Sequence, residues 1–137
     1  MWWIYALLSA FFAALTAIFA KVGIKGVNSD LATAIRTVVI LIIAWAIAFF
    51  RGEVQSIGTL SKQNLLFLFL SGMATGLSWI FYYKALQIGK VSQVAPVDKL
   101  SVALAIVLSV VFLGETLTWK VATGASLIIA GTLILIL

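Results

Sequence analysis

Asp98 and Lys99 are the residues in this sequence whose types and position are best suited to chemistry. They lie one to two turns inside an apolar run that begins near residues 91–94. An ionised group inside such a run costs free energy in a membrane, so it is expected to face protein or water and to have a partner. Adjacent residues on a helix point about 100° apart, so we expect that these two side chains do not face each other.

The roles open to this pair are structural or functional. Asp98 is either a cap or structural ion-pair partner of Arg36, Lys84 or Lys99, or else a protonatable coupling site or a contact for a cationic substrate group. Lys99 is a permanent partner, a lysine that reaches the membrane surface, or a contact for an anionic group. Asp98 and Ser101 also begin a stripe of polar and small side chains, continued by Ala105 and Ser109, which is the best candidate for a cavity wall.

Other polar and aromatic positions fall on two further apolar segments. The segment around residues 65–83 carries Thr75, Ser78, Trp79 and Tyr83, with the two aromatic rings available to stack on a substrate. Thr16 belongs to a set of small residues at helical spacing in the first segment. Close helix packing explains most such small-residue patterns in membranes, including Gly72 and Gly76, and is the alternative to a cavity lining.

Three more charged residues need an explanation. Arg36 lies about one turn into its segment and stays ionised when buried, so we include it among the candidate binding residues. Lys84 is expected to reach the membrane surface from the end of its segment. Glu115 is expected to accept hydrogen bonds from free N–H groups where the last segment begins.

The composition shows what kind of protein holds these residues. Of the 137 residues, 64% are hydrophobic and only 9% are charged, whereas soluble domains have about 25% charged residues. The absence of Cys and His removes thiol nucleophiles, imidazole bases and soft metal ligands. We therefore expect an integral membrane protein with no catalytic residues, metal, cofactor or nucleic-acid partner.

Five apolar segments are long enough to cross a bilayer as helices, which takes about 20 residues. They are predicted near residues 3–20, 31–50, 65–83, 94–113 and 119–137. The first has no preceding basic residue, so we expect a retained span rather than a cleaved signal peptide. Ser29 or Asp30 is expected to cap the second helix, and Gly114 to follow the end of the fourth. Pro96 is expected at or just inside the start of the fourth, where it is tolerated or makes a bend.

The positive charges specify the orientation of these spans only weakly. One side holds three basic residues and the other holds four, or six if Arg36 and Lys99 are counted. The side with more positive charge is expected in the cytoplasm. Weak specification is either accidental or a means for copies to insert both ways, and two inverted copies could then form a transporter with a site at the midplane.

The last segment has a candidate seam for helix pairing. Gly124 and Gly131 are seven residues apart on one helix face, with Ile128 between them. Small residues allow helices to approach closely. The sequence leaves open whether this seam lies inside the monomer or at a dimer interface.

The carboxy-terminal half also resembles a known family. The stretches YYKALQIGKVSQVAPVDKLSV and FLGETLTWKVATGASLIIAGTLIL resemble the EamA-type domain of the drug/metabolite transporter superfamily, in its short five-helix bacterial and archaeal branch. The amino-terminal half agrees more loosely, through its small-residue first span and the Arg36 region. Small multidrug resistance exporters are similar in size, but their first helix carries a Glu that the first span here lacks.

The resemblance implies an all-α membrane domain over residues 1–137, with five transmembrane helices forming one half of an inverted-repeat transporter. It implies a secondary transporter for a small organic metabolite in the cell membrane, working by alternating access as an antiparallel homodimer. The family's cavity is lined by the first, third and fourth helices of each half. Two alternatives remain: a non-transporting membrane subunit that needs a distinct partner chain, and a flippase for a lipid-linked substrate.

Overall fold

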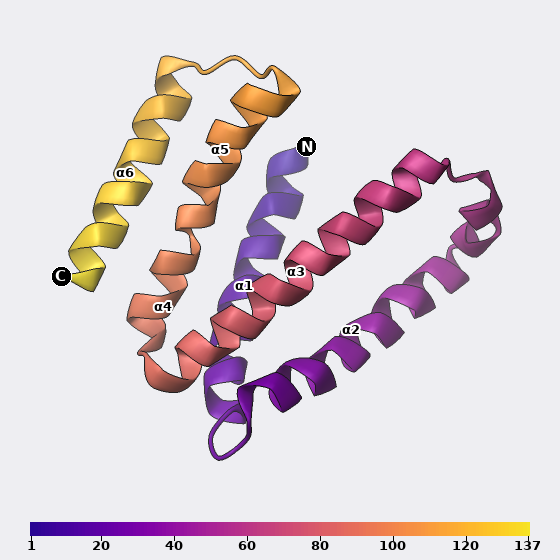
Figure 1. Ribbon diagram of the computed structural model, residues 1–137, viewed down its shortest axis with the longest axis horizontal. Coiled ribbons are helices and arrows are strands. Elements are labelled where there is room, and N and C mark those ends of the chain that lie inside the picture. Colours follow the sequence, from indigo (N-terminus) through magenta and orange to yellow (C-terminus); the bar gives the residue numbers. More distant parts are fainter. The chain divides into compact units, whose positions relative to one another are not determined.

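A computed structural model describes the whole chain, residues 1–137, and every regular element in it is a helix (Figure 1). Five segments are long and apolar enough to span a membrane, so the all-helical class and the five spans are confirmed. The fourth span, Val91–Leu113, consists of two helices. The elements in chain order are α1 (Trp2–Gly23), α2 (Ser29–Phe50), the 3-10 helix η1 (Glu53–Thr59), α3 (Lys62–Ile88), α4 (Val91–Asp98), α5 (Leu100–Leu113) and α6 (Trp119–Ile136).

The chain divides into two compact units. One consists of Ala20–Gln87, and the other of Met1–Phe19 together with Ile88–Leu137. The single domain over residues 1–137 stays a prediction, and each unit is described by itself below.

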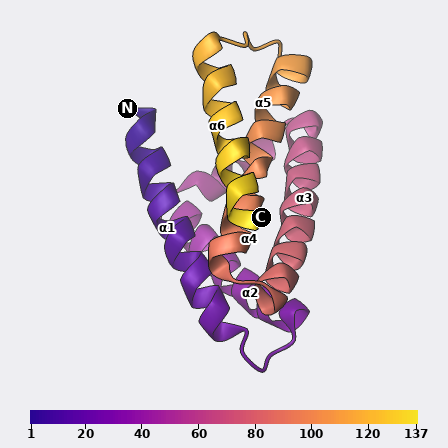
Figure 2. The same ribbon diagram turned by 90° about the vertical axis from the view of Figure 1, so that its left-hand side faces the viewer.

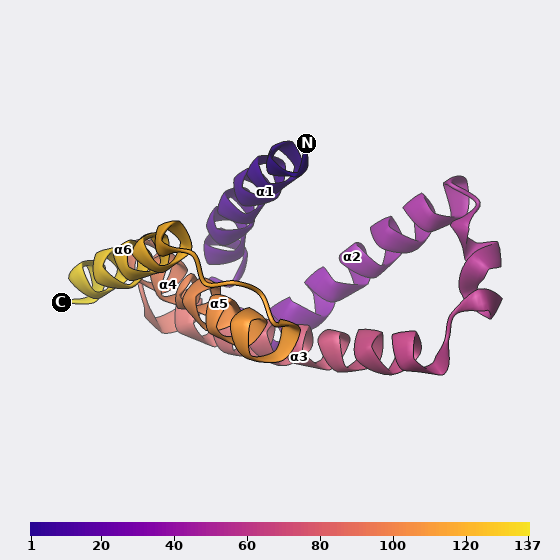
Figure 3. The same cartoon turned by 90° about the horizontal axis from the view of Figure 1, so that it is seen from above.

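Within the unit Ala20–Gln87, α2 and α3 run in opposite directions on either side of η1. The start of α2 lies near the end of α3, and the two helices diverge toward η1 (Figures 1 and 3). They are connected by long side chains near the start of α2. The contacts between α2 and α3 therefore depend on a few charged and aromatic residues.

The residue that caps α2 is Asn28, and not Ser29 or Asp30 as the sequence suggested. Asn28 has extended backbone angles, and its Oδ1 accepts from the N–H groups of Asp30 at 2.8 Å and Leu31 at 3.4 Å. The earlier expectation was wrong because α2 begins at Ser29, which places the two expected caps inside its first turn. The cap satisfies N–H groups that have no partner within the helix.

Replacing Asn28 with alanine is expected to destabilise the protein by about 1 kcal/mol, because two N–H groups lose their acceptor. Thermal unfolding in detergent, followed by circular dichroism, measures the loss. Asn28→Asp is the control, since its carboxylate can accept the same hydrogen bonds. An unchanged midpoint in Asn28→Ala would show that the cap adds no stability.

In the other unit, α4 and α5 both pack against α6, and α5 and α6 form an antiparallel hairpin (Figures 1 and 2). Gly114 ends α5 with a φ of +68°, a left-handed conformation that favours glycine, so its predicted place is confirmed. Thr118 caps α6, and its Oγ1 accepts from the N–H of Val121 at 3.3 Å. The role expected for Glu115 thus belongs to Thr118, which lies next to the first residue of α6.

Pro96 lies inside the fourth span, and the helix is interrupted just after it. It is the sixth residue of α4, which ends at Asp98. The N–H of Lys99 donates to the Pro96 carbonyl, and the N–H of Val102 donates to the Lys99 carbonyl, each at 3.0 Å. Both bonds join residues three positions apart, whereas the bonds of an α-helix join residues four positions apart. Buried Thr132 of α6 also donates to the Pro96 carbonyl, at 3.3 Å. Proline has no N–H and crowds the turn before it, whereas this interruption follows the proline.

Large apolar side chains cover most of the surface of the chain. Phe69, Phe112 and Leu127 are more than 60% exposed, and Leu86 is the one large side chain that is fully buried. Exposed apolar surface of this extent indicates a contact with lipid or with another protein. The protein is therefore in contact with the lipid bilayer, in agreement with its five apolar helices.

Candidate functional site

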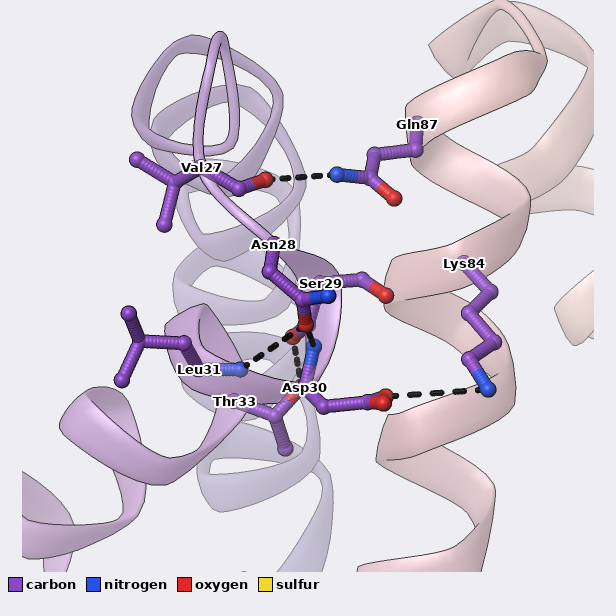
Figure 4. A network of polar contacts seen from close by, with 8 residues as sticks. All are labelled: Val27, Asn28, Ser29, Asp30, Leu31, Thr33, Lys84 and Gln87. Carbon is purple, nitrogen blue, oxygen red and sulfur yellow. Dashed lines mark hydrogen bonds and ion pairs between the residues drawn. The ribbon is translucent and has the colours of Figure 1, made fainter.

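A network of polar contacts joins the start of α2 to the end of α3 (Figure 4). Asp30 and Lys84 form an ion pair, with Oδ1 and Nζ 3.7 Å apart. Gln87 donates from Nε2 to the Val27 carbonyl at 2.6 Å, next to the Asn28 cap. Lys84 was expected to reach the membrane surface or to pair with Asp98, so its contact with Asp30 was missed. The sequence did contain a sign of this ion pair, because two opposite charges lie at helix ends that are on the same side of the membrane.

Farther along the same two helices, Arg36 contacts two aromatic rings. Its guanidinium carbon lies 4.1 Å from the centre of the Trp79 ring and 5.4 Å from that of the Tyr83 ring. Trp79 and Tyr83 are four residues apart on α3, so they lie on one helix face. Tyr83 is only 4% exposed and Arg36 is half-buried. Three of the predicted site residues thus form one cluster, called here the arginine–aromatic cluster.

The other two predicted residues of α3 are not part of this cluster. Thr75 lies one turn before Trp79, is exposed, and donates its hydroxyl to the Ser71 carbonyl at 2.9 Å. Ser78 is also exposed. Gly72 and Gly76 have no atom of another part of the chain within 4 Å of the position a Cβ would take. Within the unit Ala20–Gln87, close helix packing therefore does not account for Gly72 and Gly76.

Asp98 and Lys99 do face each other, contrary to the expectation from helical geometry. The Asp98 Oδ2 and the Lys99 Nζ are 3.5 Å apart. The expectation assumed one continuous helix, whereas α4 ends at Asp98 and α5 begins at Leu100. The side chains of the pair are 35% and 56% exposed, respectively, so both remain accessible.

The two remaining predicted residues belong to the same unit as this ion pair. Ser101 is exposed in the first turn of α5. Thr16 is half-buried on α1 and donates its hydroxyl to the Phe12 carbonyl at 2.8 Å. The break before Leu100 also interrupts the stripe that was drawn from Asp98 through Ser101 to Ser109 on a continuous helix.

These contacts provide two kinds of binding group. The arginine–aromatic cluster offers a fixed positive charge beside two ring faces. The Asp98–Lys99 pair offers a carboxylate and an amine at an interrupted helix. Charged groups of this kind can recognise a polar solute. Interrupted helices form the binding sites of many transporters.

Comparison with known proteins identifies the family of the chain. The model of a family described as the EamA-like transporter family matches residues 1–137. Over 134 residues the chain is 50% identical to a Sinorhizobium protein named "uncharacterized transporter in cobO 3'region". The alignment covers 98% of this chain and 95% of that protein. No solved structure matches the chain significantly. The protein is a multi-pass membrane protein, which in a bacterium lies in the plasma membrane, and it belongs to the EamA-like transporter family.

Proposed function

We propose that this protein is a secondary transporter that moves a small organic metabolite by alternating access, as an antiparallel homodimer. The observation that carries the proposal is the family match over the whole chain, which has five candidate spans. Transporters are commonly built from two halves of inverted orientation that meet around a midplane site. Two oppositely inserted copies of this chain would supply those halves.

The surface of the chain supports an assembly of two copies. Gly124 and Gly131 on α6 are exposed, and no atom of another part of the chain lies within 4 Å of the position a Cβ would take at either. Small residues of this kind let transmembrane helices approach closely. Neither Cβ position meets another part of its own unit, so a second copy is the partner that we propose for this seam.

We assign two groups of residues to transport, and each group is described within its own unit. They are Arg36, Thr75, Ser78, Trp79 and Tyr83 in the unit Ala20–Gln87, and Thr16, Asp98, Lys99 and Ser101 in the other. The accessible ion pair and the arginine–aromatic cluster are the groups that we expect to contact the solute.

Transport itself is tested with purified protein in liposomes. We expect saturable counterflow of at least one labelled metabolite from a panel of amino acids, organic acids, sugars, nucleosides and amines. Liposomes without protein provide the background. If the dimer is intact and no compound of the panel exchanges, the transport proposal is contradicted.

Dual orientation is tested by single cysteines, because the chain has none of its own. Gln55→Cys lies in exposed η1 and Ser92→Cys in the exposed first turn of α4, and neither changes the charges that bias insertion. We expect an impermeant thiol reagent to label a fraction of each variant in intact cells, and the remainder after permeabilisation.

The two cysteines lie on opposite sides of the membrane in any one orientation, because α3 separates them. Labelling of only one position from outside would therefore show a single topology. That result would contradict the antiparallel homodimer and favour a distinct partner chain.

A further inference from the structure

Arg36 is a cation within a candidate membrane span, and in its own unit it has aromatic contacts but no anionic partner. It lies seven positions after Ser29, the first residue of α2, which places it about 10 Å along the helix at the usual rise of 1.5 Å per residue. Trp79 and Tyr83 contact its guanidinium. The ring faces attract the positive charge but offer no oxygen atom to its five N–H donors.

The four acidic side chains of the chain are accounted for elsewhere. Asp30 pairs with Lys84, and Asp98 pairs with Lys99. Glu53 lies in η1 and Glu115 in the turn before α6, and neither forms an ion pair. Within the unit Ala20–Gln87, the guanidinium of Arg36 therefore has donors that no carboxylate accepts from.

A planar guanidinium with free donors matches one kind of ligand group. Carboxylate and phosphate oxygens accept two parallel N–H bonds from arginine, and such charge-assisted bonds are stronger than neutral ones. Contact with the Trp79 ring restricts the guanidinium before a ligand arrives, which lowers the entropy lost on binding. A cationic solute would instead meet like charge at this point.

We propose that Arg36 binds the carboxylate or phosphate group of the transported metabolite, with Trp79 and Tyr83 holding the guanidinium in place. This inference rests on the proposed transport function and narrows its substrate to an organic anion. A lipid headgroup carries the same chemistry. However, the lysines nearer the helix ends, Lys25 and Lys84, are the first cations that a headgroup would meet.

The test uses Trp79 as the reporter of binding. The other four tryptophans, Trp2, Trp3, Trp45 and Trp119, are replaced by phenylalanine, and the full chain is placed in nanodiscs of phosphatidylcholine. Succinate and inorganic phosphate are the probes, and the uncharged dimethyl ester of succinate is their control. We expect a saturable change in Trp79 fluorescence with at least one anion and none with the ester.

Variants of Arg36 show whether the guanidinium is responsible. Arg36→Gln is expected to weaken anion binding by about tenfold or more, since it removes the charged donors. Arg36→Lys keeps the positive charge but lacks the planar guanidinium, so its anion affinity is expected to lie between those of the parent and Arg36→Gln. Arg51→Gln removes the same charge at the end of α2 and is the matched control, expected to bind as the parent does. Equal binding by the parent and both Arg36 variants would overturn the proposal.

The remaining outcomes show whether the anion is a lipid or a solute, and they distinguish failure of this inference from failure of the transport proposal. An Arg36-dependent change caused by phosphatidylglycerol nanodiscs, and not displaced by succinate or phosphate, would overturn the substrate assignment in favour of a lipid. Counterflow of neutral or cationic compounds alone, without anion binding, would overturn this inference and leave the transport function standing. Anion binding through Arg36 without counterflow of any compound would support the site and contradict transport.

Discussion

Gly131→Leu is expected to convert the dimer into monomers and to reduce counterflow to the level of protein-free liposomes. Gly131 and Gly124 lie on one face of α6, and no other part of their unit lies within 4 Å of the position a Cβ would take at either. A leucine there fits the isolated chain, but it would separate two helices that meet at glycine. Single-molecule photobleaching in liposomes at increasing dilution measures the dimer fraction, and counterflow measures activity.

The neighbouring position supplies the control for this prediction. Ala130→Leu adds a comparable side chain to the same helix, about 100° around from Gly131, and Ala130 is also exposed. It is expected to keep both the dimer and the activity. A stable, active dimer in Gly131→Leu would show that the α6 glycines are not the interface between copies.

Asp98→Asn is expected to abolish counterflow while most of the protein remains folded. The Asp98 carboxylate is one-third exposed and lies 3.5 Å from Lys99 at the break between α4 and α5. A carboxylate there can take up and release a proton or pair with a cationic solute group, whereas an amide neither titrates nor carries a charge. Counterflow per folded dimer is the measurement, with the folded fraction taken from size-exclusion chromatography.

Lys99→Gln and the double variant separate a transport role from a structural ion pair. Removing one partner of an ion pair leaves the other charge unpaired, and removing both avoids that cost. If Asp98 acts in transport, the double variant recovers folded protein but not counterflow. Recovery of both would assign the pair to structure alone.

Much of the architecture could be predicted from the sequence. The apolar segments between polar connections gave the five spans, because bilayer thickness sets the length of a spanning helix. Gly114 was placed correctly because the left-handed end of a helix favours glycine. The caps of α2 and α6 were misassigned to residues one to three positions away, since several adjacent polar residues can each accept an N–H.

The candidate site was predictable in its residue types but not in its contacts. Arg36, Trp79 and Tyr83 were each selected for their own chemistry, yet nothing in the pattern joined Arg36 to the two rings. The Asp98–Lys99 contact was excluded on the assumption of an unbroken helix, although Pro96 lies two residues before it. The Asp30–Lys84 pair was missed because its members are 54 positions apart in the sequence.

The sequence by itself determined the membrane class, the number of helices and the family, because hydropathy and helix length are properties of each segment alone. Helical periodicity also placed Trp79 and Tyr83 on one face of α3. Only the tertiary structure decided which side chain meets that face. Periodicity orders residues around one axis and carries no information on the neighbouring helix. The contact of Arg36 with the two rings depends on how α2 and α3 lie beside each other at the start of α2.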